Sequence, residues 1–257
     1  MTDLRRDLRE RKARPIRRGF SFVGVLGELL ITAGVLVFLF LGWQLWLNDL
    51  IVGGEQNKVG LSLSHSLSGE HDGNHPAASP PAVGFGIPVV AMPSTNAAQF
   101  GVMYIPRFGT DYVRSISEGV ETAKVLDLNG IGHYPGTQMP GEIGNFAVAA
   151  HRTTHGAPFK QIASLRVGDK IYVQTADGYY TYDFRGLEYV RPSGVGVLEA
   201  VPQLTGAAAT DRIMTMTSCN PEFYAAERIV AYSVLESWQP TTAGPPVAIK
   251  ATIAMKG

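Results

Sequence analysis

The sequence predicts an all-β domain, a barrel or a sandwich with short helices, preceded by a single transmembrane helix. Three observations support this prediction. Residues 29–47 contain no charged side chain, the residues that follow are rich in Gly, Ser, Pro and Asn, and from about residue 100 short apolar runs alternate with Gly and Pro. A chain of 257 residues is long enough for one ordinary domain with such appendages.

Residues 1–19 form a basic segment that we expect to be a cytoplasmic tail. The segment holds eight Lys/Arg and three acidic residues, so the remainder of the chain is mildly acidic although the whole is balanced at 22 basic and 22 acidic residues. Nucleic-acid binding requires clustered positive charge on the folded domain. The composition therefore excludes nucleic acid as a partner, and the tail is explained by the apolar segment beside it.

Residues 20–47 are predicted to form a transmembrane helix that acts as a signal anchor. The uncharged stretch would span roughly 28 Å as a helix, close to the thickness of the hydrocarbon core of a bilayer. Trp43 and Trp46 lie near its far end, where aromatic side chains favour the interface, and Glu28 lies near its start. A buried core helix of this length would show a polar face, which is missing here.

The anchor is expected to be retained, with the N-terminus in the cytoplasm and the rest of the chain outside the cell. A cleaved signal peptide has a shorter apolar region, about 7 to 15 residues, and a small-x-small cleavage site. Asn48-Asp49-Leu50 follows here instead. The basic flank sets the orientation through the positive-inside rule.

Residues 48–99 have the composition of a flexible extracellular linker. They are rich in Gly, Ser, Pro, Asn and His and show little apolar periodicity, so they cannot bury enough surface to offset the entropy of ordering. His65, His71 and His75 fall in this segment, but no matching Cys or acidic pattern accompanies them. We expect no metal site here and no cofactor anywhere in the chain.

Residues 100–257 form the predicted β domain. β-branched and aromatic runs predict strands at 102–105, 145–150, 170–175, 179–184, 211–217 and 229–235. Asp177-Gly178 is a strong hairpin signal between two of them. Short helices are expected at 115–125 and 159–165. Six or more short strands with few helices indicate an all-β barrel or sandwich.

Cys219 is the only cysteine, so it cannot form an internal disulfide. In an exported protein an unpaired cysteine is an intermolecular link or a reactive thiol. A thiol becomes a nucleophile when a histidine takes its proton, and His151 follows an apolar strand that would deliver it to a barrel rim. Arg228, nine residues after the cysteine, offers a permanent cation with a planar donor fork. His133 and His155 have weaker claims, and a buried structural cysteine remains the alternative.

Several motifs resemble those of the sortases, a family of membrane-anchored cysteine transpeptidases. T-M-T-S-C at 215–219 is similar to the family's T-L-x-T-C pattern, with Met216 for leucine and Ser218 for threonine, and N-F-A-V-A-A-H-R precedes it. The stretch at 132–146, G-H-Y-P-G-T-Q-M-P-G-E-I-G-N-F, resembles the segment before the family's histidine. C-N-P after the cysteine and H-R-T-T-x-G-A-P-F after the histidine look most like class E sortases of high-GC actinobacteria.

The resemblance implies an eight-stranded sortase-type β-barrel and a transpeptidase. Cys219 would attack the Thr-Gly amide of a C-terminal LAXTG- or LPXTG-like sorting signal, and an amine on a lipid II-like peptidoglycan precursor would resolve the thioester. His151 would act as general acid and base, and Arg228 would hold substrate and stabilise the oxyanion. The partners would be sorting-signal-bearing secreted proteins, the precursor amine and the membrane.

Four further residues are weaker candidates for substrate binding. Thr217 and Ser218 adjoin the cysteine, and Tyr134 and Tyr112 lie in expected loops that could border a peptide groove. Alternative functions are a pilin-polymerising sortase and a catalytically silent anchored surface module. A papain-like thiol protease is disfavoured because here the histidine precedes the cysteine and no glutamine-bearing helix opening leads to it.

Overall fold

The computed structural model describes residues 21–69, 84–90 and 95–255, which belong to two units. The first unit ends at Trp43 and the second runs from Gln44 to the C-terminus.

Helix α1 (Phe22–Gly42) makes up the described part of the first unit. Its 21 residues include one charged side chain, Glu28, and none of its side chains is buried. Phe38, for example, is 80% exposed. Among the described residues, α1 is the one helix that is long and apolar enough to cross a membrane. The predicted apolar helix is therefore present, and a π-helical turn, η1 (Trp43–Leu47), follows it.

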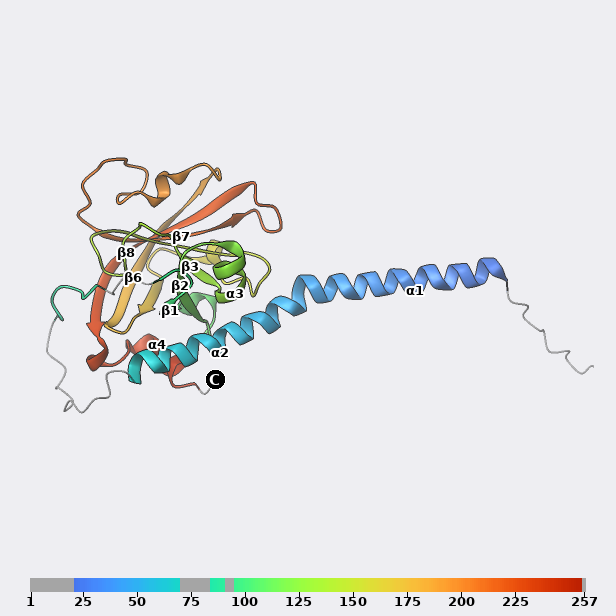
Figure 1. Ribbon diagram of the computed structural model, residues 1–257, viewed down its shortest axis with the longest axis horizontal. Coiled ribbons are helices and arrows are strands. Elements are labelled where there is room, and N and C mark those ends of the chain that lie inside the picture. Colours follow the sequence, from blue (N-terminus) through green and yellow to red (C-terminus); the bar gives the residue numbers. More distant parts are fainter. Residues whose placement is uncertain (1–20, 70–83, 91–94, 256–257) are drawn as a thin grey trace, which may run out of the picture. The chain divides into compact units, whose positions relative to one another are not determined.

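Helix α2 (Asn48–Gly69) occupies the first part of the segment that the sequence predicted to be a flexible linker. That prediction is wrong for these 22 residues, because α2 packs against strands of the barrel along one side of it (Figure 1). The helix buries small and polar residues as well as two leucines: Gly53, Gln56, Gly60, Leu61, Ser64 and Leu67. Such a composition is typical of a linker. Here, however, packing against the barrel stabilises the segment as a helix.

Eight strands of the described chain close into a barrel in the order β1-β2-β3-β4-β7-β8-β6-β5. The strands are β1 (Gln99–Tyr104), β2 (Val113–Glu118), β3 (Ile131–His133), β4 (Gly144–Ala150), β5 (Lys170–Gln174), β6 (Gly178–Val190), β7 (Arg212–Asn220) and β8 (Glu227–Pro240). The β2–β3 and β4–β7 pairs are parallel and the other pairs are antiparallel. The expectation of an eight-stranded barrel is confirmed.

Short helical segments lie between the strands, and two more follow the last strand. They are η2 (Pro106–Phe108), η3 (Thr122–Leu126), α3 (Asp127–Asn129), η4 (Ile162–Ser164), η5 (Val195–Leu198), η6 (Thr241–Ala243) and α4 (Val247–Ile253). The helix predicted at 115–125 is wrong: its first residues belong to β2, whose side chains are buried on both faces and so lack strand alternation. The helix predicted at 159–165 is reduced to the single turn η4. The Asp177-Gly178 hairpin is confirmed between β5 and β6.

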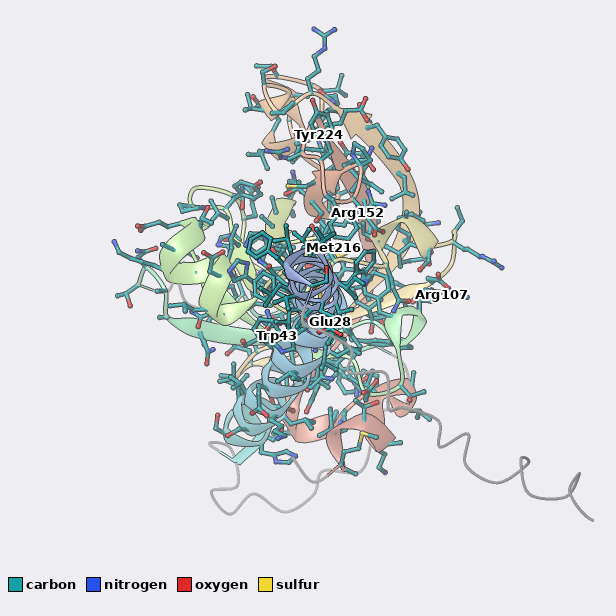
Figure 2. All side chains as sticks on the ribbon, turned by 90° about the vertical axis from the view of Figure 1, so that its right-hand side faces the viewer. Glu28, Trp43, Arg107, Arg152, Met216 and Tyr224 are labelled. Carbon is teal, nitrogen blue, oxygen red and sulfur yellow. The ribbon has the colours of Figure 1, made fainter. Side chains whose placement is uncertain are left out.

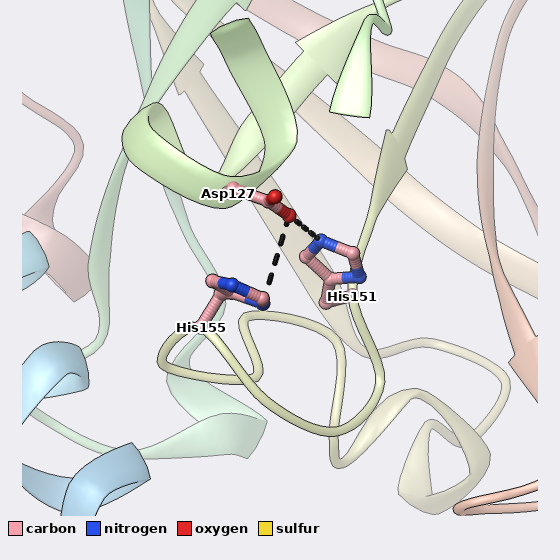
Figure 3. A group of neighbouring side chains, drawn as sticks. All are labelled: Asp127, His151 and His155. Carbon is pink, nitrogen blue, oxygen red and sulfur yellow. Dashed lines mark hydrogen bonds and ion pairs between the residues drawn. The ribbon is translucent and has the colours of Figure 1, made fainter. Parts of the chain in front are cut away.

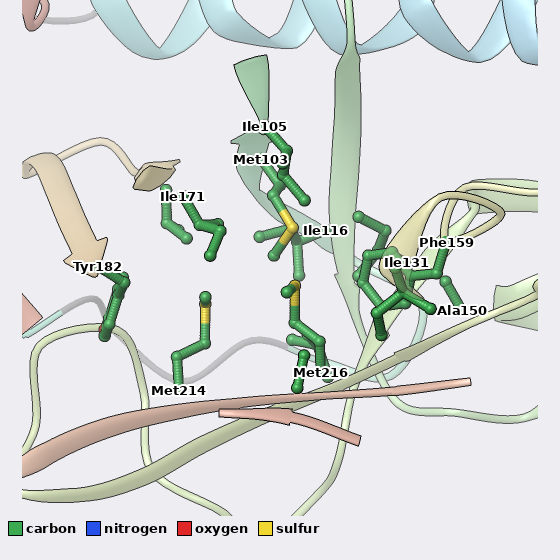
Figure 4. Close-up of a cluster of buried hydrophobic side chains, with 14 of the residues drawn as sticks. Met103, Ile105, Ile116, Ile131, Ala150, Phe159, Ile171, Tyr182, Met214 and Met216 are labelled. Carbon is green, nitrogen blue, oxygen red and sulfur yellow. The ribbon is translucent and has the colours of Figure 1, made fainter. Parts of the chain in front are cut away.

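The interior of the barrel is filled by large apolar side chains contributed by most of its strands (Figure 4). Met214 and Met216 of β7 and Ile116 of β2 belong to this core and are fully buried. The neighbouring residues Thr215 and Thr217 point to the other face of β7 and are buried as well, so the strand becomes partly exposed only at its ends, one of which carries Cys219.

A second apolar cluster lies where α2 and α4 cover the outside of the barrel. At its centre the Ser64 and Tyr104 hydroxyls lie 2.8 and 2.7 Å from Oε1 of Gln174, and Gln174 Nε2 donates to the Ser64 carbonyl at 3.0 Å. Ser64 and Gln174 are buried completely. Because buried polar groups are costly unless paired, this network fixes where along the barrel α2 docks.

Candidate functional site

Cys219 and His151 lie at adjoining strand ends. β4 and β7 run parallel, with Ala149 opposite Thr217, so that His151 and Cys219 each follow two residues further on. Ser218 donates a hydrogen bond to the Ala150 carbonyl at 2.8 Å and ties the two strands together at this level. The sequence placed both residues at strand ends, and the structure brings the two ends side by side.

Cys219 lies on the outer face of β7. Met214 and Met216 point into the barrel, and the alternation of a strand therefore directs the cysteine outward. Arg228 of β8 is its direct cross-strand partner. Partners of an antiparallel pair project from the same face, so the side chains of Cys219 and Arg228 start next to each other on the outside of the barrel. Cys219 itself is partly buried and lines a hollow at the protein surface.

A hollow of about 270 Å³ opens at these strand ends. Its lining comes from the loop after β4 and from the β7–β8 turn: His151, Arg152, Thr153, Thr154, Cys219, Phe223, Tyr224 and Ala225. Phe223 and Tyr224 are 62% and 71% exposed, although both are large aromatic residues. Figure 2 shows Tyr224 in the outer part of the barrel unit and Met216 in its interior. The hollow thus combines a thiol, an imidazole and an apolar rim.

Arg228 is not among the residues that line this hollow. Its Nη1 donates instead to the Ala225 and Glu227 carbonyls at 3.3 and 3.0 Å, which closes the β7–β8 turn. The side chain is partly exposed, so these bonds compete with water and are readily exchanged. Arg228 therefore lies next to Cys219 but faces its own turn.

Arg152 also lines the hollow, although it was not among the residues predicted from the sequence to form the site. Its guanidinium donates to the Cys219 carbonyl at 3.4 Å and to the Asn220 side chain, and it lies 3.9 Å from a Glu222 carboxylate oxygen. These contacts hold the end of β7 and the start of the following turn against the loop after β4. Its position directly after His151 was the only signal in the sequence.

His151 is held by an acidic residue from another part of the chain. Its Nε2 lies 2.7 Å from Oδ1 of Asp127, the first residue of α3. His155 stacks beside it, with ring centroids 5.0 Å apart, and its Nδ1 lies 3.6 Å from the same carboxylate oxygen. Figure 3 shows the two rings and the carboxylate converging. Asp127 precedes His151 by 24 positions, and no sequence pattern links it to either histidine.

The loop that carries these histidines is braced by α2. Asp49 accepts hydrogen bonds from the backbone N–H groups of Thr154 and Gly156 at 3.1 and 3.4 Å, and Gln56 Nε2 donates to the His155 carbonyl at 2.9 Å. Thr154 and His155 adopt positive φ angles of 70° and 50°. Such conformations are uncommon for residues other than glycine and persist where the surroundings hold them.

Thr217, Ser218 and Tyr134 are three of the four weaker substrate-binding candidates, and each has a partner close to the end of β7. The Thr217 hydroxyl lies 2.9 Å from the Tyr134 hydroxyl, and Ser218 is bonded to Ala150. Thr217 and Ser218 are 4% and 3% exposed. They underlie the strand end that carries Cys219, and none of the three lines the hollow.

Tyr112 is a core residue. It is buried, packs edge-on against Phe108 and donates a hydrogen bond to the Pro158 carbonyl at 2.9 Å. Burial raises the pKa of its phenol well above the ordinary range. The idea that Tyr112 borders the peptide groove is not supported, because its side chain fills the space beneath the loop after β4.

The other histidines have structural contacts or lie outside the described residues. His133 is buried, with Nδ1 2.6 Å from a Glu118 carboxylate oxygen and its ring stacked on Phe146. His65 is exposed on α2 and contacts the Ile253 carbonyl at 2.8 Å. His71 and His75 lie outside the described residues. Within the described chain, Asp127, His151 and His155 are the residues grouped closely enough to hold a metal ion.

A thiol and an imidazole in one hollow, at the end of a closed eight-stranded barrel, are the groups that thiol-dependent acyl transfer requires. Comparison with known proteins agrees. A family model of the sortase domain matches residues 103–236, about half of the chain. The chain therefore belongs to the sortase family, whose members are cysteine transpeptidases that act on proteins carrying a sorting signal.

Its relatives include class E sortases, as the motifs predicted. Sortase SrtE1 of Streptomyces coelicolor is 33% identical over 93% of this chain, and the match spans 65% of that protein's length. The crystal structure of Sortase E1 from the same organism, with a tripeptide in the active site, is 36% identical over 60% of this chain and 97% of that one, with a TM-score of 0.56. SrtA sortase from Actinomyces oris is 31% identical over 67% of this chain and 99% of that one, with a TM-score of 0.62.

Proposed function

We propose that this chain is a membrane-anchored transpeptidase that cleaves the Thr-Gly bond of a C-terminal LAXTG- or LPXTG-like sorting signal. The observation that carries the proposal is the pairing of Cys219 with His151 at the ends of β7 and β4, in one hollow. Cys219 is partly buried and lines this hollow, which disfavours the alternative of a buried structural cysteine. The tripeptide in the active site of the related Streptomyces enzyme agrees with a peptide substrate.

The reaction proceeds through a thioester. The Cys219 thiolate attacks the threonine carbonyl carbon, the C–N bond of the Thr-Gly amide breaks, and His151 gives a proton to the leaving amine. An amine of a lipid II-like peptidoglycan precursor then attacks the thioester carbon and the C–S bond breaks. His151 takes a proton from this amine, and Cys219 leaves as thiolate. No cofactor is needed for either half-reaction.

Arg228 supplies the positive charge in this scheme. Turned toward the thiol, its planar guanidinium would hold the peptide backbone and stabilise the oxyanion of each tetrahedral intermediate. Its present bonds to the Ala225 and Glu227 carbonyls would be exchanged for bonds to the substrate. Arg152, which bonds the end of β7, would hold the strand that carries the nucleophile.

α1 and the basic residues before it support the membrane location. A helix of 21 residues with one charged side chain fits a single span, and the positive-inside rule puts the N-terminus in the cytoplasm and the barrel outside. There the enzyme would meet both secreted substrates and the precursor amine.

The test is a transpeptidation assay of the full chain in detergent, with Ala and Pro versions of the sorting peptide side by side and an amine acceptor. Cys219→Ala and His151→Ala should each reduce product formation to background while thermal unfolding stays cooperative. If either variant keeps more than a small fraction of the activity, its assigned role is wrong. Thr153→Ala, another residue that lines the hollow, serves as the control for general disturbance of the site.

A further inference from the structure

We infer that Asp127, His151 and His155 form a binding site for a divalent transition-metal ion such as Zn²⁺, and that the bound ion blocks transpeptidation. The second half of this inference rests on the proposed function, because it uses the acid-base role of His151. The first half rests only on the geometry of the three side chains.

The donor atoms are close to the arrangement that zinc needs. Each residue offers one ligand atom, and the three atoms lie within 4.8 Å of one another. Two imidazoles and one carboxylate are a common zinc donor set, with bonds of about 2.0–2.2 Å, so ligand atoms around a tetrahedral ion lie about 3.3 Å apart. The Asp127 oxygen lies 2.7 Å from His151 Nε2 and 3.6 Å from His155 Nδ1. Small side-chain rotations are enough to admit the ion.

The position of His155 is built into the fold. Its backbone has a positive φ angle, its carbonyl is bonded by Gln56, and the N–H of the preceding residue is bonded by Asp49. The hydrogen-bonded loop therefore holds the ring near Asp127. The same Nδ1 also lies within hydrogen-bonding distance of the Thr154 hydroxyl, at 3.1 Å. Residues with such backbone conformations cluster at ligand clamps, and both Thr154 and His155 adopt them here.

Access and open coordination positions favour binding from solution. The side chains of Asp127, His151 and His155 are 26%, 20% and 46% exposed. Three protein ligands leave at least one position for water, as in zinc sites that exchange their ligands. The carboxylate also offsets part of the charge of a divalent ion.

Binding would stop proton transfer for a chemical reason. The ion takes the lone pair of His151 Nε2, and any proton on that nitrogen is released to water. The other ring nitrogen of a metal-bound neutral imidazole carries the N–H. His151 then has no lone pair left to accept a proton from Cys219 or from the incoming amine, so the half-reactions that need a base are lost.

The binding test uses calorimetry with Zn²⁺ on the full chain in detergent, without a polyhistidine tag, in a Cys219→Ala background that removes the thiol as a ligand. Adding His155→Gln should weaken zinc affinity by at least about tenfold, and Asp127→Asn provides a second variant of the same site. His65→Gln, which changes an exposed histidine on α2, is the matched control and should not alter the affinity. Equal affinity in all variants, or no binding in the Cys219→Ala protein, would overturn the proposed site.

The inhibition test compares transpeptidation with and without Zn²⁺. We expect zinc to inhibit the unmodified chain, a chelator to restore activity, and His155→Gln to need at least about tenfold more zinc for half inhibition. Equal sensitivity of the two proteins would overturn the inhibitory role. If the chain shows no transpeptidation without zinc, the proposed function has failed, and the calorimetry still decides whether the metal site exists.

Discussion

The proposed roles of three side chains, at the ends of β4, β7 and β8, depend on the residues that the fold brings next to them. The sequence identified Cys219, His151 and Arg228 through residue chemistry and motif resemblance, and the structure gathers all three at one end of the barrel. It could not identify Asp127, because the contact with His151 exists only after η3 and α3 fold across the strand ends. Spacing in the sequence carries no information about such a contact.

Arg228→Lys tests the role of the guanidinium at the residue scale. An ammonium group lacks the planar fork, so it cannot hold two oxygens at once, and we expect kcat for transpeptidation to fall roughly 10²-fold. Arg107→Lys is the control, since Arg107 bonds Asp169 and does not line the hollow. Retention of more than half of the activity by Arg228→Lys would contradict an oxyanion role.

Among the elements, the strands were predictable and α2 was not. Apolar β-branched runs mark a strand wherever one face is buried, so the predicted strands locate β1 and β4 to β8, although β6 and β8 extend well beyond the predicted 179–184 and 229–235. α2 has Gly and Ser at the positions that meet the barrel, and these residues favour linkers when judged by propensity alone. In α2 they favour docking, because small residues let a helix approach a sheet closely.

A pair of glycine substitutions in α2 tests this docking. A Cβ added at Gly60 would lie 2.9 Å from Val113 Cγ1 and 3.0 Å from the Val113 carbonyl oxygen, whereas nothing lies within 4 Å at Gly54. Gly60→Ala should therefore destabilise docking by about 1–3 kcal/mol. Gly54→Ala should be neutral or stabilise the helix by about 0.5–1 kcal/mol.

Hydrogen exchange of the full chain measures the difference. Gly60→Ala should speed exchange in α2 and in residues 151–157, the segment that Asp49 and Gln56 hold, while Gly54→Ala should leave both protected. If both variants exchange alike, α2 does not brace the loop that carries His151. A fragment starting at residue 100 would lack this brace altogether and is a poor substitute for the full chain in activity assays.

For the whole molecule, buried tyrosines predict a loss of stability at alkaline pH. Burial raises the pKa of Tyr104, Tyr112 and Tyr182 well above the ordinary value of about 10. In the unfolded chain these phenols ionise near pH 10, whereas in the barrel they stay protonated. Their contribution to stability is thus complete below about pH 10 and is lost as pH rises, by about 1.4 kcal/mol per pH unit for each tyrosine.

Urea unfolding at about pH 8 and pH 11 checks this prediction. The midpoint should fall at the higher pH, and Tyr112→Phe should reduce the size of that fall by one tyrosine's share. An unchanged midpoint in the unmodified chain would contradict the prediction.

Strand β7 carries core residues on its inward face and the reactive thiol on its outward face. Met214 and Met216 fill the barrel, whereas Cys219 reaches the hollow. For directed evolution, a library at the inward positions would tune thermal tolerance, and one around the hollow would tune which peptides are accepted. Inserting or deleting one residue in this strand would exchange its two faces, so length changes there should be absent from any functional library.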